Sequence, residues 1–194
     1  MKTENIDRFP LSKHKTVKGS RRLVREKVLQ ILVARSVCEL DLDELFNHIF
    51  FREFNFGEDQ VKYEKLLKPD EIYEIEADIP VKWNSDEIDF GQNLLNNTIS
   101  NRNYVDELLN EFANNWELDR IAQIDRVLMH IAVTELMNFP EIPPKVSINE
   151  AIDIAKKYST DKSSIFINGV LDSVLAKLKS GKLINKSGRG LKES

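Results

Sequence analysis

Apolar side chains recur every three or four residues along most of the chain, which is the spacing of one face of an α-helix. The first stripe begins after Ser20, whose hydroxyl is placed to cap a helix, and the second covers residues 41–55 behind Asp41, another capping residue. Five later stripes cover residues 86–99, 104–112, 121–136, 147–158 and 161–179. The pattern therefore predicts about seven helices.

The later helices carry start and stop signals. The stripe at 121–136 is apolar over so wide an arc that this helix must be central in the fold. The prolines within 140–144 end it, and Ser147 with Glu150 forms a capping box that predicts the start of the next helix. Gly181 is expected to stop the last helix.

Composition supports helices over strands. Glycine and proline number only 7 and 6 in 194 residues, so the residues that punctuate many-stranded folds are scarce. We expect an all-α fold with one helical domain at 20–179, a flexible basic arm at 1–19 and a disordered basic tail at 180–194. Residues 56–85 fit a short strand, a short helix or an exposed insertion, and periodicity does not choose among them. We treat this stretch as a variable insertion.

Charge is distributed unevenly. Residues 1–27 hold nine basic and three acidic residues, residues 177–194 hold six and one, and the segment between them holds 13 and 28. Basic ends on an acidic body favour a polyanionic partner at the ends and a basic protein partner on the body. The same distribution is also typical of charged tails that only keep a protein soluble.

Little in the sequence points to catalysis. Cys38 is the only cysteine, so an internal disulfide is excluded and a cytoplasmic location is expected. The three histidines lack the spacing of metal ligands, and we find no glycine-rich phosphate loop and no apolar run long enough to span a membrane. For Glu135, inside an apolar helix, a structural hydrogen bond to a neighbouring helix is favoured over acid–base work. We therefore expect no enzyme activity, catalytic residue, metal or cofactor.

Two clusters are suited to nucleic acid. Arg21, Arg22 and Arg25, with Lys18 nearby, open the first helix, and planar guanidinium groups donate paired hydrogen bonds to phosphate. At the start of the last helix, Phe166 could stack on an unpaired base or fill the core, and spacing alone favours the core.

Four runs of the sequence resemble the NusB family. Residues 21–30 (RRLVREKVLQ) are similar to its arginine-rich opening helix, and residues 124–136 are similar to its central helix. Residues 148–158 (INEAIDIAKKY) and 166–172 (FINGVLD) match its two most distinctive runs. The order and spacing of the four runs agree as well.

This resemblance implies about seven helices in two small bundles packed across each other. It implies a non-enzymatic transcription antitermination factor that pairs with NusE, a small-subunit ribosomal protein, and binds single-stranded boxA RNA. The pair would join the antitermination complex on RNA polymerase during rRNA transcription. An apolar patch on the first bundle is expected to serve either NusE or a homodimer, not both.

The resemblance also assigns residues. The three arginines correspond to RNA-touching arginines of the family, and Phe166 to a phenylalanine that meets RNA, which reverses the preference for a core role. Val33 stands where the family usually has a tyrosine, so stacking or hydrogen bonding from that position is lost. Lys162 stands where relatives often have an acid, which should favour RNA.

Two other functions fit the helical pattern. The same fold occurs as the RNA-binding module of rRNA methyltransferases, which we expect to require a large cofactor-binding domain after residue 180. A pure protein-interaction domain would instead use the acidic body, and direct RNA binding at physiological salt separates it from the first hypothesis.

Overall fold

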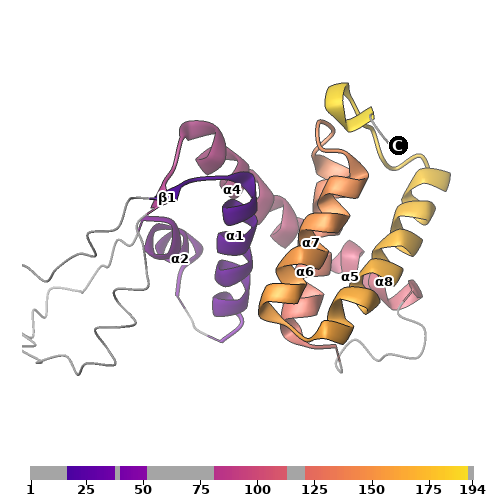
Figure 1. The fold of residues 1–194 in the computed structure, drawn as a ribbon, viewed down its shortest axis with the longest axis horizontal. Helices are drawn as coiled ribbons and strands as arrows, with labels where there is room; N and C mark the ends of the chain where they lie inside the picture. Colours follow the sequence, from indigo (N-terminus) through magenta and orange to yellow (C-terminus); the bar gives the residue numbers. More distant parts are fainter. Residues whose placement is uncertain (1–16, 38–39, 52–80, 113–120, 192–194) are drawn as a thin grey trace, which may run out of the picture.

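The computed structural model describes residues 17–37, 40–51, 81–112 and 121–191, which form seven α-helices, two short irregular helices and one pair of short strands (Figure 1). The α-helices are α1 (Arg21–Arg35), α2 (Leu42–Phe46), α4 (Ser85–Ser100), α5 (Arg102–Phe112), α6 (Gln123–Asn138), α7 (Pro144–Tyr158) and α8 (Asp161–Ser180). The other elements are the strands β1 (Val17–Lys18) and β2 (Val81–Lys82), the π-helix η1 (Asn47–Phe51) and the 3-10 helix η3 (Gly188–Leu191). The all-α prediction is confirmed.

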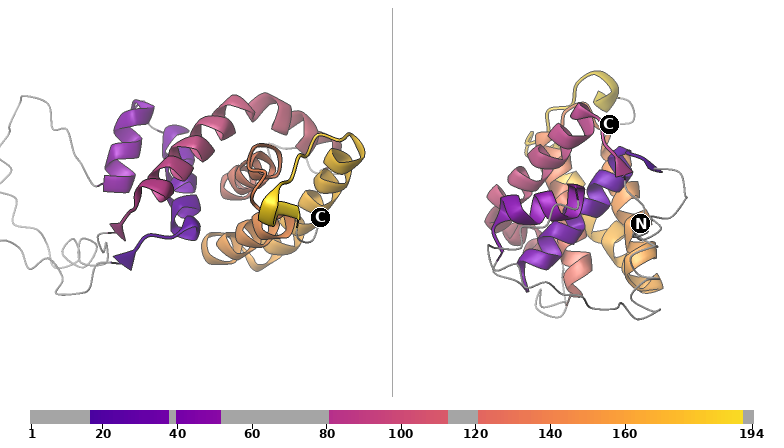
Figure 2. Two further views of the ribbon diagram at one scale, coloured as in Figure 1. Left: turned by 90° about the horizontal axis from the view of Figure 1, so that it is seen from above. Right: turned by 90° about the vertical axis from the view of Figure 1, so that its left-hand side faces the viewer.

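The helices form two bundles that pack across each other. The N-terminal bundle contains α1, α2, η1 and α4, and the C-terminal bundle contains α5 to α8 (Figure 1). Viewed from above, α4 extends from the N-terminal bundle across to the C-terminal bundle (Figure 2). Both α1 and α4 pack against α6, so α6 joins the two bundles.

The central position predicted for the fifth helix is that of α6. Every residue from Leu128 to Leu136 is buried, the polar ones included, because helices of both bundles surround this part of α6. Full burial of one leucine or isoleucine stabilises a fold by roughly 1.5–3 kcal/mol. Leu128, Ile131 and Leu136 are each 2% exposed or less, so this helix contributes much of the core.

Three helix starts show which local signals the chain uses. Ser20 and Asp41 cap α1 and α2 as predicted, and their side chains accept hydrogen bonds from backbone amides at 3.2 and 2.8 Å. The predicted capping box at Ser147 is wrong, because α7 begins one turn earlier, at Pro144. A proline at the first helical position already has the required φ and lacks an N–H that would be left unpaired. Ser147 is instead buried inside the helix.

The predicted boundaries of the arm and the insertion need correction. β1, which lies in the predicted arm at 1–19, pairs in parallel with β2, which lies in the predicted insertion at 56–85. The amide of Gly19 donates to the carbonyl oxygen of Lys82 at 2.8 Å. α4 then begins at Ser85. Nearly all of the rest of both segments lies outside the described residues, and its description stays a prediction.

The C-terminal tail, predicted to be disordered over 180–194, returns to the loop between α6 and α7 (Figure 1). The amide of Ser187 donates to the carbonyl oxygen of Pro140 at 2.9 Å. Gly190 lies so close to this same carbonyl that a Cβ atom would clash with it. The described part of the tail, as far as Leu191, is therefore packed against the domain.

The side chain of Lys186 completes this contact. Its Nζ donates to the carbonyl oxygen of Glu135 at 3.3 Å and to that of Phe139, the residue after α6, at 3.0 Å. Burial lowers the pKa of Lys186, although the nearby acids oppose this effect. The hydrophobic pattern of the sequence could not predict this contact, because the acceptors are backbone atoms.

Candidate nucleic-acid interface

The first turn of α1 presents two exposed arginines. Arg21 lies over the ring of Phe90, with Cζ 4.8 Å from the ring centroid, and its Nη1 lies 3.5 Å from Glu141. Arg22 Nη1 lies 3.4 Å from Asp153 on α7, and its Nε lies 3.9 Å from the buried Glu26. The two arginine side chains are 48% and 45% exposed, and exposed ion pairs contribute at most about 1 kcal/mol. A phosphate could therefore recruit both guanidinium groups at little cost to the fold.

Arg25, one turn further on, does not belong to this surface. Its Nε and Nη2 donate to the two carboxylate oxygens of Glu135 at 2.5 and 3.0 Å, and its Nη1 lies 3.7 Å from Glu150. The side chain is only 5% exposed. The structure thus removes Arg25 from the predicted RNA-binding set, because its guanidinium is enclosed and already paired. The structural hydrogen bond predicted for Glu135 is confirmed.

A buried carboxylate joins α1 to the end of α7. Glu26 accepts hydrogen bonds from Lys157 Nζ and from the Tyr158 hydroxyl, both at 2.7 Å. The hydrogen bonds to Glu26 and Tyr158 raise the pKa of Lys157, and burial raises the pKa of Tyr158. This contact holds the end of α7 to α1, and α8 begins three residues after α7 ends.

The start of α8 carries the other two predicted residues. Lys162 is exposed, and Phe166 is half-buried with its ring packed against the edge of the core. Ser163 is buried, and its hydroxyl lies 2.9 Å from those of Ser159 and Thr160, which fixes the turn between α7 and α8. Phe166 is thus partly packed against the core and partly exposed to solvent.

These residues make up a candidate surface, which we call the basic face. It runs from β1 and the first turn of α1, along the edge of α7, to the start of α8. Its residues are Lys18, Arg21, Arg22, Lys157, Lys162 and Phe166. Sequence reasoning missed Lys157, because the Glu26 that positions it lies 131 residues away in the chain.

His130 and Arg126, on α6, share one acid. Asp106 Oδ1 lies 2.7 Å from Arg126 Nη2 and 2.9 Å from His130 Nε2. Burial lowers the pKa of His130 below 6.5, and the charges of Arg126 and Arg102 add to this, although Asp106 acts in the opposite direction. Burial alone would raise the pKa of Asp106, but its bonds to Arg126 and His130 prevail and lower it below 3.8. His130 is therefore neutral, and Asp106 charged, at neutral pH.

This pKa shift makes the stability depend on pH. Between pH 6.5 and the lower pKa of folded His130, the unfolded chain binds a proton that the folded chain does not. The free energy of unfolding should therefore keep its full value above pH 6.5 and decrease as the pH is lowered through this window. Urea titrations at pH 7.5 and 5.5 measure the fall, which should be smaller in His130→Gln. An identical fall in both proteins would contradict the assignment to His130.

Within the described ranges, no group of three histidine, cysteine, aspartate or glutamate side chains could hold a metal ion. In the same part of the chain, none of the helices is long and apolar enough to cross a membrane.

Fold and surface together define a class of protein: two crossed helical bundles with a basic face built from the first and last helices. A sequence model of the NusB family matches residues 60–176. The chain is 41% identical over 172 residues to the transcription antitermination protein NusB of Chloroherpeton thalassium, covering 89% of this chain and 69% of that protein. It is 46% identical over 113 residues to the NusB of Salinibacter ruber, covering 58% and 71% of the two chains. The chain belongs to the NusB family.

Solved structures agree on the fold. NusB from T. maritima superimposes with a TM-score of 0.55 at 26% identity, covering 83% of this chain and 94% of that one. NusB in a complex of the antitermination factors NusB and NusE with dsRNA gives 0.59 at 18% identity, covering 81% and 96%.

Proposed function

We propose that this chain is a non-enzymatic transcription antitermination factor of the cytoplasm that pairs with NusE and binds boxA RNA. This chain aligns with 69% and 71% of the length of two relatives that are named transcription antitermination proteins. A protein of the same fold has been solved in complex with NusE and dsRNA. The observation that carries the proposal is the pair of exposed, weakly held arginines that opens the basic face. The complex would act on RNA polymerase during rRNA transcription.

The basic face suits an RNA strand in two ways. Arg21 and Arg22 would neutralise phosphates, because both side chains are about half exposed and solvent already screens their pairs with Glu141 and Asp153. Phe166 would offer one side of its ring to an unpaired base while the other side stays on the core. Lys162 would supply a further exposed positive charge near Phe166, at the start of the same helix.

Exposed apolar side chains of the N-terminal bundle offer a surface for a protein partner. Val37, Leu40 and Phe51 are 77%, 47% and 40% exposed. A basic ribosomal protein would also be attracted by the acidic middle of the sequence. NusE and a second copy of this chain would compete for the same side chains.

A titration of boxA RNA with the full chain, with and without NusE from the same organism, tests the proposal. Affinity should rise when NusE is present and fall as salt is raised, because bound phosphates release counterions. A scrambled RNA of equal length serves as the control. Equal affinity for both RNAs, with NusE present, would refute a boxA factor.

Phe166→Ala should lower the affinity for boxA RNA roughly five- to hundredfold, because stacking of one base is worth about 1–3 kcal/mol, and it should lower the affinity for the scrambled RNA by less. Fluorescence anisotropy with both RNAs measures the two affinities. Ile165→Ala is the matched control, since Ile165 is the adjacent residue and is 77% exposed. An equal loss of affinity for both RNAs in Phe166→Ala would indicate a packing role alone.

A further inference from the structure

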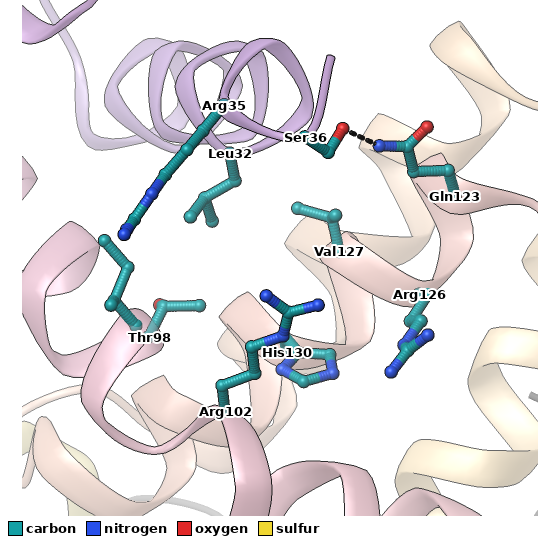
Figure 3. A pocket seen from close by; sticks show the side chains of 10 residues that line it. Leu32, Arg35, Ser36, Thr98, Arg102, Gln123, Arg126, Val127 and His130 are labelled. Carbon is teal, nitrogen blue, oxygen red and sulfur yellow. Dashed lines mark hydrogen bonds between the residues drawn. The ribbon is translucent and has the colours of Figure 1, made fainter. Parts of the chain in front are cut away.

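A pocket of about 400 Å³ lies at the other end of α1, between the last turn of this helix, the junction of α4 and α5, and the start of α6 (Figure 3). Pockets of this size hold small molecules. Arg22 and Arg35 are the second and last residues of α1, so the pocket lies roughly 20 Å along the helix from the basic face. It is therefore separate from the surface proposed for RNA, and ligand binding to this pocket can be tested apart from boxA binding.

Three arginines line the pocket, and two of them lack an acidic partner. Arg126 is held by Asp106, with Nη2 at 2.7 Å and Nε at 3.2 Å from the carboxylate oxygen. Arg35 and Arg102 form no ion pair with any acid in the described part of the chain. Figure 3 shows their side chains entering the pocket from α1 and from α5. Two permanent positive charges thus face the same space without compensation.

The rest of the lining is mixed. Leu32, Ile99 and Val127 give apolar walls. Gln123 donates through its side-chain nitrogen to the hydroxyl of Ser36, which leaves the amide oxygen of Gln123 as an acceptor. The pocket therefore offers guanidinium donors, an apolar wall and an acceptor in one place.

We infer that this pocket binds a nucleoside 5′-phosphate, with the phosphate on Arg35 and Arg102 and the base against the apolar wall. A phosphate monoester carries about two negative charges at neutral pH and three terminal oxygens, which match two guanidinium groups, whereas a carboxylate carries a single charge. Inorganic phosphate would leave the apolar wall and most of the volume unused. A nucleoside supplies an apolar face, and its hydroxyl and amino groups can donate to Gln123. The ligand is either a free nucleotide or a nucleotide of an RNA strand.

Calorimetric titration of the full chain tests this inference with 5′-AMP, adenosine, inorganic phosphate and a 5′-phosphorylated RNA trinucleotide. AMP should bind at least tenfold more tightly than adenosine or phosphate. Arg35→Gln and Arg102→Gln should each weaken AMP binding roughly tenfold or more, because each removes a charge-assisted hydrogen-bonding group. Lys179→Gln, which removes an exposed cation in the last turn of α8 outside the pocket and the basic face, should leave AMP binding unchanged. Both lining arginines are exposed, and circular dichroism verifies that the variants are folded.

The outcomes divide clearly. Tighter binding of AMP than of the trinucleotide identifies a free nucleotide, and the reverse order, with the same sensitivity to Arg35→Gln, identifies an RNA strand. Equal binding of AMP and inorganic phosphate would overturn the nucleoside part of the inference. Undetectable binding of both AMP and the trinucleotide at millimolar concentration, or binding that survives both arginine substitutions, would overturn it entirely.

Discussion

Replacing Arg25 with alanine is expected to lower the free energy of unfolding by about 3–5 kcal/mol, because the change leaves the carboxylate of Glu135 buried without its partner. Glu135 is fully buried, so water cannot take the place of the guanidinium. Chemical denaturation of the full chain measures the loss. The effect should be among the largest that a single substitution produces in this fold.

Two further variants make this test specific. Arg21→Ala, which removes a half-exposed pair with Glu141, should change the stability by no more than about 1 kcal/mol. Replacing both buried partners, as in Arg25→Met with Glu135→Leu, should recover most of the loss, because no unpaired charge then remains. A small loss in Arg25→Ala, similar to that of Arg21→Ala, would show that the buried pair does not hold α1 to α6.

The double variant Arg21→Gln with Arg22→Gln should bind boxA RNA roughly tenfold or more weakly at low salt while remaining folded. Each phosphate contact to a single strand contributes about 0.7 to the slope of log affinity against log salt, so the slope should fall by about 1.4. Titrations at several salt concentrations, with NusE present, measure the affinity and the slope together.

Lys179→Gln provides the matched control for this experiment, since Lys179 is an exposed cation in the last turn of α8, far along the helix from Lys162. Its affinity and salt slope should match those of the parent protein. If the double variant kept the parent slope, Arg21 and Arg22 would not contact phosphate, and the RNA surface would have to lie elsewhere.

Local signals were enough to predict the helices. An apolar stripe, a serine or aspartate cap and a stop signal all act within a few residues, so α1, α6 and α8 begin and end close to their predicted bounds. The error at Ser147 arose where two local signals competed. Proline at the first helical position prevailed over the capping box, and the sequence contains both.

The candidate site was less predictable, because its residues are distinguished by distant partners. Arg21, Arg22 and Arg25 are similar side chains on one helix, and sequence spacing treats them alike. The structure separates them, since the guanidinium of Arg25 is buried against Glu135, 110 residues later, while the side chains of Arg21 and Arg22 stay about half exposed. The arginine-lined pocket escaped prediction for the same reason: its walls come from three separate segments of the chain.

The pairing of Arg25 with Glu135 also bears on the order in which the protein folds during synthesis. A ribosome adds about 5–20 residues per second, so the 110 residues between the two partners take roughly 5–20 s to make. Until Glu135 has left the ribosome, Arg25 stays exposed to water, and the face of α1 that packs against α6 cannot be buried. The N-terminal bundle is thus made first but completed late, and its exposed apolar side is open to chaperones for most of translation.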